Sequence, residues 1–151
     1  MKKTILHLKD LALLDKRYKA NLINSLSGFK SVFLVGTKNK SGQENLTLVS
    51  SVVHIGSDPA CLGAVFRPNT VPRHGYENIL NTHSYTLNLV SNSFYKQAHQ
   101  STARYPREVS EFEAVGLEPE YISDVFAPFV KTSPLKLGLK LVEKIDIKYN
   151  P

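Results

Sequence analysis

The chain has 151 residues, of which 42% are hydrophobic and 21% charged, and its formal net charge is +6. This length suits one domain with a single hydrophobic core, and no run approaches the ~20 apolar residues that a membrane span needs. The single cysteine, Cys61, excludes a disulfide within the chain. The first ten residues contain lysines but no apolar run behind them, so we expect an untargeted, cytoplasmic protein.

Positive charge gathers in the first third of the chain. Residues 1–50 hold nine lysines and arginines against three acids, whereas residues 51–100 hold three against two and residues 101–151 seven against eight. A basic segment of this kind is compatible with nucleic-acid binding. Its lysines are scattered, however, and no aromatic-rich strand lies among them on which bases could stack, so we interpret the segment as a solvated face.

The first expected element is a helix that begins near Asp15, a capping residue, and ends at Gly28. Its apolar residues at helical spacing are Tyr18, Leu22, Ile23 and Leu26. Strand signals follow at 31–37, 45–55, 61–66 and 85–90, with turn residues at 39–42 and 56–59. Segment 45–55 carries apolar residues on both faces, which predicts one long strand covered on each side.

Three short helices and two further strands are expected in the second half of the chain. Their signals are helical spacing at Tyr76, Ile79 and Leu80, a cap at Ser93 before Phe94 and Ala98, a capping box of Ser110 and Glu113 closed by Gly116, and alternation over 135–141 and at Ile145, Ile147 and Tyr149. Consecutive strands with a few connecting helices predict a mainly β (α+β) fold, an antiparallel barrel rather than alternating βαβ units.

The loop that follows the strand at 61–66 holds the clearest binding signal. Pro68 and Pro72 each remove a backbone hydrogen-bond donor, so a β-strand paired on both sides cannot run through the loop. Four polar side chains accompany the first N–H groups of the next helix: Arg67, Thr70, Arg73 and His74. These groups suit a phosphate dianion, and the alternative is a solvated basic loop.

The usual motifs of catalysis are absent from the sequence. There is no GxGxxG, Walker loop, HExxH or GxSxG, which leaves a Rossmann dehydrogenase, an ATPase, a zincin and an α/β-hydrolase without support. The five histidines are dispersed, so we expect no metal site. The glutamates between residues 108 and 120 are interpreted as a solvated helical face rather than an acid/base pair. Chemistry would then depend on a bound cofactor.

The run from residue 45 to about residue 113 resembles the flavin reductase-like, FMN-binding split-barrel family, which includes flavoredoxin. NLTLVSSV (45–52) resembles its Asn-x-x-Pro-x-Ser strand, SDPA (57–60) its Asp-Pro-Pro turn, PRHGYENI (72–79) its Lys-Asp-Thr-x-x-Asn-Ile segment, and YTLNLV (85–90) its Phe-x-Val-Asn strand. STARYP (101–106) and VSEFEAVGL (109–117) resemble its Ser-x-x-Tyr-Pro and Glu-Phe-x-x-x-Gly-Leu pieces. Gly75 departs from the pattern, since the family often has a threonine there whose hydroxyl meets the phosphate.

The resemblance implies a split β-barrel with a non-covalent FMN site. The flavin ring would lie against strand 45–52, with hydrogen bonds from backbone groups and from Asn45, Thr47, Ser50 and Ser51. The FMN phosphate would be held by Arg67, Thr70, Arg73 and His74, with Ser101 and Tyr105 as further residues of the same pocket. No side chain need act as an acid or base.

The activity implied is that of an oxidoreductase that accepts a hydride from NADH or NADPH and passes electrons to a second acceptor. The resemblance also implies a homodimer, with neither nucleic acid nor a membrane as partner. Two alternatives stay open: a flavin carrier or sensor without reductase activity, and an OB-like barrel that binds nucleic acid. We expect one domain over residues 1–151. Because family members continue past the equivalent of residue 147, either the chain is truncated or a partner covers an open strand edge.

Overall fold

The computed structural model describes residues 5–67, 72–122 and 124–147, and it divides the chain into two compact units, residues 1–30 and 31–151. The first unit holds helices α1 (Leu8–Leu13) and α2 (Lys16–Ser25), and neither has a buried residue. Asp15 caps α2 as predicted, because its Oδ1 accepts hydrogen bonds from the amides of Arg17 and Tyr18. The expectation of one domain stays a prediction.

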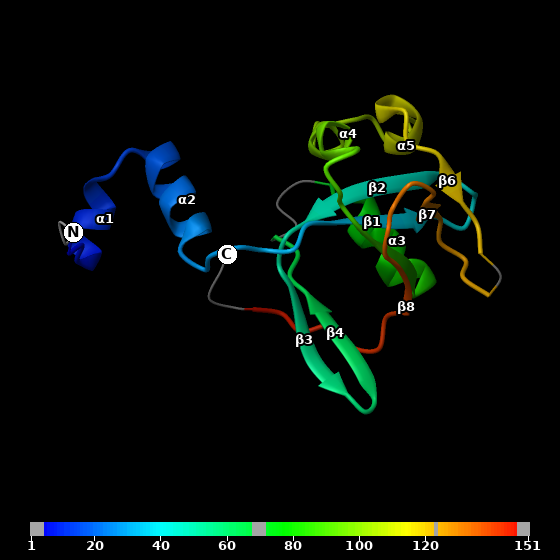
Figure 1. Cartoon of the computed structure of the whole chain (residues 1–151), viewed down its shortest axis with the longest axis horizontal. Coiled ribbons are helices and arrows are strands. Elements are labelled where there is room, and N and C mark those ends of the chain that lie inside the picture. The colour runs from blue at the N-terminus through cyan, green and yellow to red at the C-terminus, as the bar shows by residue number, and fades with distance from the viewer. Residues whose placement is uncertain (1–4, 68–71, 123, 148–151) are drawn as a thin grey trace. The chain divides into compact units, whose positions relative to one another are not determined.

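A four-stranded antiparallel sheet forms the centre of the second unit (Figure 1). Its strand order is β2 (Glu44–Val49), β1 (Phe33–Lys38), β5 (Ser84–Leu89) and β8 (Lys136–Lys140). β1 is buried over Phe33–Thr37 because it lies between two strands and is covered on both faces. The mainly β, antiparallel prediction is confirmed.

The prediction of one long strand over 45–55 is wrong. The chain leaves the sheet at Ser50 and Ser51, and β3 (Val52–Ser57) pairs with β4 (Ala60–Ala64) in a separate hairpin that projects away from the sheet (Figure 1). Val53 and Ile55 of the hairpin are 53% and 67% exposed. Apolar residues on both faces of 45–55 therefore reflect two successive strands that belong to different sheets.

The three expected helices of this unit are α3 (His74–Thr82), α4 (Tyr95–Gln100) and α5 (Glu111–Val115). α4 begins after Phe94 rather than Ser93, whereas α5 begins and ends as predicted, with Gly116 in the left-handed conformation. The capping box is wrong, since the Ser110 hydroxyl oxygen is buried without a hydrogen-bond partner among the described residues.

Two short strands were not expected, β6 (Pro119–Glu120) and β7 (Phe129–Val130), which pair with each other. β8 confirms the predicted strand at 135–141. The further strand expected at Ile145 and Ile147 is absent from residues 141–147, and Tyr149 lies outside the described residues. Within the described part of the chain, no helix combines the length and apolar character needed to cross a membrane.

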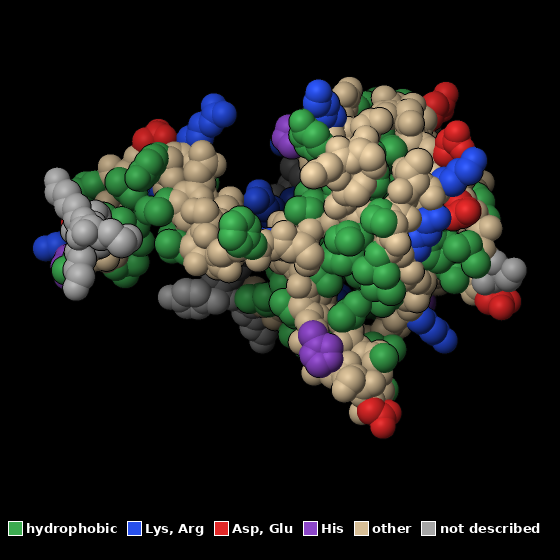
Figure 2. Space-filling model, in the orientation of Figure 1, with side chains coloured by type: hydrophobic (Ala, Val, Ile, Leu, Met, Phe, Trp, Pro, Cys, Tyr) green, Lys and Arg blue, Asp and Glu red, His purple; other side chains and the backbone are tan. Residues whose placement is uncertain are grey.

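Apolar side chains alternate between two cores, one on each face of the sheet. Leu34 and Leu46 pack with α4 and α5, whereas Val35 and Val49 pack with Ile79 of α3. Figure 1 shows α4 and α5 on one side of the sheet and α3 on the other. The second core is the more open, with several half-buried members, and Figure 2 shows hydrophobic side chains gathered above the β3–β4 hairpin.

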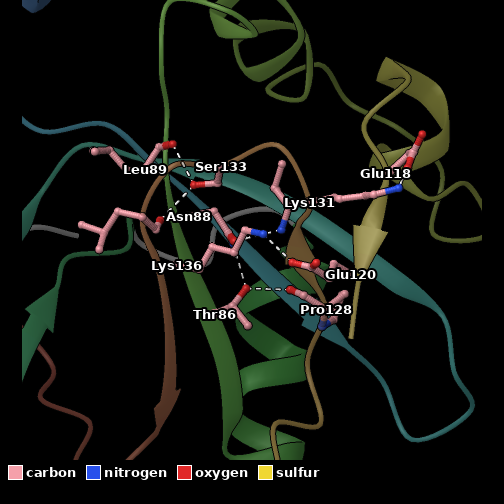
Figure 3. Close-up of polar contacts among 11 residues, drawn as sticks. Thr86, Asn88, Leu89, Glu118, Glu120, Pro128, Lys131, Ser133 and Lys136 are labelled. Carbon is pink, nitrogen blue, oxygen red and sulfur yellow. Dashed lines mark hydrogen bonds and ion pairs between the residues drawn. The ribbon is translucent and has the colours of Figure 1, made fainter. Parts of the chain in front are cut away.

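A polar network crosses the first core (Figure 3). Nδ2 of Asn88 donates to the Leu34 carbonyl (3.1 Å) and to Oγ1 of Thr86 (2.9 Å), while its Oδ1 accepts from the Val130 amide (2.8 Å). Thr86 in turn donates to the Pro128 carbonyl (2.7 Å). Because Asn88 and Thr86 are fully buried, these bonds compensate their desolvation and fix β1, β5 and β7 relative to one another.

Candidate functional site

The first turn of α3 packs directly on strand β2. A Cβ atom at Gly75, the second residue of α3, would lie 2.5 Å from Oδ1 of Asn45 and 2.8 Å from Oγ1 of Thr47. Real Cβ atoms essentially never come so close, so a threonine at this position would displace either Asn45 or the helix. Glycine thus lets the predicted basic loop and the predicted ring-binding strand meet.

Asn45 is held by two side-chain hydrogen bonds. Its Nδ2 donates to Oε2 of Glu111 (2.8 Å), and its Oδ1 accepts from Oγ1 of Thr47 (3.1 Å). The backbone N–H of Leu46 donates to the same Oε2 of Glu111 (3.0 Å). Asn45 and Glu111 are each only 6% exposed. One carboxylate oxygen therefore fastens α5 to the edge of β2.

The interpretation of residues 108–120 as a solvated acidic face is wrong for Glu111. This residue lies four positions before Val115, and both are buried on the inner face of α5, whereas Glu113 is exposed. Spacing of i, i+4 with an apolar residue was the available signal that this glutamate points inward. Sequence reasoning missed Glu111 as a site residue.

Burial gives the Glu111 carboxyl unusual electrostatics. Desolvation raises its pKa above the usual range, and this effect outweighs the hydrogen bonds from Leu46, from its own backbone and from Asn45, and the charge of His74, all of which lower the pKa. His74, the first residue of α3, thus lies within electrostatic reach of the carboxylate. Groups at the start of α3 and on β2 therefore act on the pKa of one carboxyl group of α5.

Among the described residues, strand β2 is an edge strand, because β1 is its one neighbour in the sheet. The Leu46 amide bonds to Glu111 and so faces away from β1. Alternation along a strand places the backbone groups of Glu44 and Leu48 on the same outer edge. Of these outer groups, the Leu46 amide is engaged by Glu111, whereas those of Leu48 lie on the same edge further along the segment that the sequence assigned to the flavin ring.

Two arginines and a histidine of the predicted phosphate loop lie near the start of α3. His74 is the first residue of the helix and Arg73 its N-cap, and both are half-buried. Arg67 is exposed. The ring of its neighbour Phe66 lies 5.8 Å from the ring of Tyr76 in α3, which brings the end of β4 to the helix. Thr70 falls outside the described residues.

The structure does not join the remaining predicted residues to Asn45 and Thr47 by hydrogen bonds among the described residues. Ser50 and Ser51 are half-buried at the junction of β2 and β3, where the Ser51 carbonyl accepts a hydrogen bond from the Val65 amide (2.9 Å). The Ser101 hydroxyl is buried and donates to the Ala98 carbonyl at the end of its own helix (2.8 Å). Tyr105 is half-buried. In the described part of the chain, no hydrogen bond joins Ser101 or Tyr105 to Asn45 or Thr47.

Two surface hollows lie away from these residues. One of about 420 Å³ is lined by Asn39, Lys40, Ser41 and Asn81, and the other, of about 330 Å³, is lined by residues 82–84, 124–126 and 138–140. Neither contains a predicted site residue. Over the residues that the structure describes, no three or more His, Cys, Asp or Glu side chains are grouped so as to hold a metal ion.

Comparison with known proteins identifies a family. The chain matches the model of the flavin reductase like domain over residues 29–149. A crystallised protein from Shewanella frigidimarina NCIMB 400, assigned as a flavin reductase with a split barrel domain, is 49% identical, with a TM-score of 0.94 over 98% of this chain and 73% of that one. An uncharacterized protein of Aquifex aeolicus (strain VF5) is 27% identical over 135 residues, 88% of this chain and 68% of that protein.

More distant structures share the fold. The 2-nitrobenzoate 2-nitroreductase NbaA of Pseudomonas fluorescens has a TM-score of 0.81 at 22% identity, covering 95% of this chain and 68% of its own. Flavoredoxin of Desulfovibrio vulgaris (Miyazaki F) has a TM-score of 0.70 at 24% identity, covering 78% and 62%. The predicted antiparallel split barrel is confirmed, and a nucleic-acid-binding barrel is not favoured.

Proposed function

Because the chain belongs to the flavin reductase like domain family, we propose that it is an oxidoreductase that binds FMN along the outer edge of β2. Electrons would pass from NADH or NADPH through the flavin to a second acceptor. The contact of α3 with β2 at Gly75 is the observation that carries this proposal, since it brings a basic helix start to a strand edge with backbone groups that face outward.

The chemistry of the described residues suits FMN. Its phosphate carries close to two negative charges at neutral pH, which the guanidinium groups of Arg67 and Arg73, the His74 imidazole and the first amides of α3 can bind. The flavin ring has donor and acceptor atoms along one edge, which suit the outward-facing backbone groups of β2 beyond Leu46, whose own amide is engaged by Glu111. Gly75 keeps the helix start free of a side chain that would separate these two binding elements.

When bound, FMN supplies the two-electron chemistry of hydride acceptance. The chain's own residues bind and orient the cofactor. The mutual hydrogen bond of Asn45 and Thr47 fixes how these two side chains are oriented on β2. His74 supplies an imidazole that can hydrogen-bond an anion at the start of α3. We also propose a homodimer with the flavin at the subunit interface, which light scattering of the purified protein can test.

The decisive experiment is an FMN titration of the purified protein, followed by flavin fluorescence and the visible absorption spectrum. We expect saturable binding, and anaerobic mixing with NADH or NADPH should bleach the bound flavin. Binding without bleaching by either nucleotide would favour the carrier or sensor alternative. Failure to bind FMN, with salt-dependent binding to an oligonucleotide instead, would overturn the proposal.

Replacement of Arg67 and Arg73 together by alanine tests the placement of the phosphate. Loss of two charge-assisted contacts should weaken FMN binding by about 100-fold, equivalent to about 3 kcal/mol. The matched control is Lys16→Ala with Arg17→Ala in α2, which removes the same charge from the first unit and should leave FMN affinity unchanged. Wild-type affinity in the Arg67/Arg73 variant would show that the phosphate lies elsewhere.

A further inference from the structure

Glu111 is a buried ionisable group that the electron-transfer proposal does not use. Its side chain extends from the first turn of α5 to the edge of β2, and 66 residues separate it from Asn45 along the chain. A carboxylate is removed from water at considerable cost, so its burial requires compensating hydrogen bonds. Two of the bonds it accepts come from the strand that carries the proposed ring-binding edge.

Both bonds from β2 end on the same oxygen. Oε2 of Glu111 accepts from Nδ2 of Asn45 (2.8 Å) and from the amide of Leu46 (3.0 Å). The first bond fixes which way the Asn45 amide faces: with Nδ2 turned to Glu111, Oδ1 accepts from Thr47. The same Oδ1 lies closest to the position of a Cβ at Gly75, at the start of α3.

We propose that Glu111 is a positioning residue of the flavin site: its Oε2 orients Asn45 and occupies the Leu46 amide, so that the β2 edge and the start of α3 are held in the arrangement that binds FMN. This inference rests on the proposed function. Glu111 acts through Asn45 and Leu46 and need not touch the cofactor.

The geometry also separates two contributions of the carboxylate. One oxygen accepts both bonds from β2, so a glutamine whose amide oxygen takes the place of Oε2 can preserve them without a charge. An aspartate preserves the charge but withdraws the oxygen by one methylene group. If the acceptor position is what matters, Glu111→Gln retains FMN affinity and Glu111→Asp does not.

The experiment compares FMN dissociation constants of Glu111→Gln, Glu111→Asp and Glu111→Ala, each measured where circular dichroism shows the variant fully folded. We expect Glu111→Gln to stay within about threefold of wild type, and Glu111→Asp and Glu111→Ala to bind at least about tenfold more weakly. Glu113→Gln is the matched control, because Glu113 is exposed on the same helix, and it should bind as wild type.

A second readout needs no flavin. Hydrogen exchange of the Leu46 amide, followed by NMR in the FMN-free protein, should accelerate at least about tenfold in Glu111→Asp and remain slow in Glu111→Gln. Wild-type FMN affinity in folded Glu111→Asp would overturn the positioning role, as would equal losses in Glu111→Gln and Glu111→Asp.

The outcomes also separate this inference from the proposed function. If wild-type protein binds no FMN, the proposed function fails and the positioning role toward flavin fails with it, while Leu46 exchange still decides whether Glu111 clamps β2. If wild-type protein binds FMN and Glu111→Asp binds it equally well, the proposed function stands and the positioning role alone is refuted.

Discussion

Replacing Gly75 by alanine tests the contact between α3 and β2 with the smallest possible change. The new Cβ would lie 2.5 Å from Oδ1 of Asn45 and must move to at least 3.0 Å. Asn45 cannot simply rotate away, because doing so breaks its bonds to Glu111 and Thr47. The alternative is a displacement of the whole first turn of α3.

The magnitude follows from opposing contributions. The two costs are alternatives: rotation of Asn45 breaks two hydrogen bonds worth about 1 kcal/mol each, whereas displacement of the helix turn leaves an overpacked contact that costs about 1–3 kcal/mol. Alanine in place of a helical glycine returns up to about 1 kcal/mol. We therefore expect Gly75→Ala to lower the free energy of unfolding by about 1–2 kcal/mol, and to weaken FMN binding about tenfold because His74 and the strand edge move apart.

Urea unfolding followed by circular dichroism measures the first effect, and flavin fluorescence the second. Asn81→Ala is the control for helix propensity, since Asn81 is exposed on α3, and its stability should equal or exceed that of wild type. A Gly75→Ala protein that is as stable as wild type and binds FMN equally well would refute the proposed packing of α3 on β2.

Three further changes probe the stability of the fold. Ser110→Ala should leave the free energy of unfolding, measured in urea, unchanged or raise it by up to about 1 kcal/mol, because the hydroxyl is buried without a partner among the described residues. A loss of about 1 kcal/mol would mean that Ser110 caps α5 after all. The pKa of Glu111 is raised in the folded protein, so its proton binds more tightly there than in the unfolded chain. Wild type should therefore lose stability relative to Glu111→Gln as the pH rises from the ordinary pKa of 4.5 through the pKa of the folded protein. A difference in unfolding free energy between the two proteins that does not change with pH would contradict this. Gly36→Ala should destabilise by about 3 kcal/mol or more in thermal unfolding, because its Cβ would lie 2.1 Å from the Pro128 carbonyl oxygen and 2.6 Å from Oγ1 of Thr86, and near-native stability would show that β7 can move away from the sheet.

Local signals in the sequence predicted much of the secondary structure. Asp15 caps α2 and Gly116 ends α5 because a cap or a left-handed residue acts on backbone groups only a few positions away. The alternation over 135–141 likewise predicted β8, which has one face toward the core. Such features depend on neighbours in the sequence, so the sequence alone contains them.

Features that depend on distant partners could not be predicted in this way. An apolar run such as 45–55 fits one covered strand or two strands in different sheets, and the choice at Ser50 and Ser51 is made by pairing with β1 and β4. Glu111 lies among similar glutamates, and its burial depends on β2, far away in the sequence. The strand β6 has only two residues, which are too few to show an alternating pattern, and it forms because β7 pairs with it.

The three hydrogen bonds of Asn88 have a consequence for how the sheet finds its alignment. Strand β5 alternates apolar and polar residues, so a slide by two positions would keep every side chain on its proper face, and hydrophobic burial alone barely opposes such a slip. Such a slip would, however, move the buried side-chain amide of Asn88 away from the Leu34 carbonyl and the Val130 amide, and so leave it without these hydrogen bonds. Asn88 therefore selects one register of β5. Replacement of Asn88 by leucine should give a sheet that still forms but in which β5 pairs with its neighbours in more than one register.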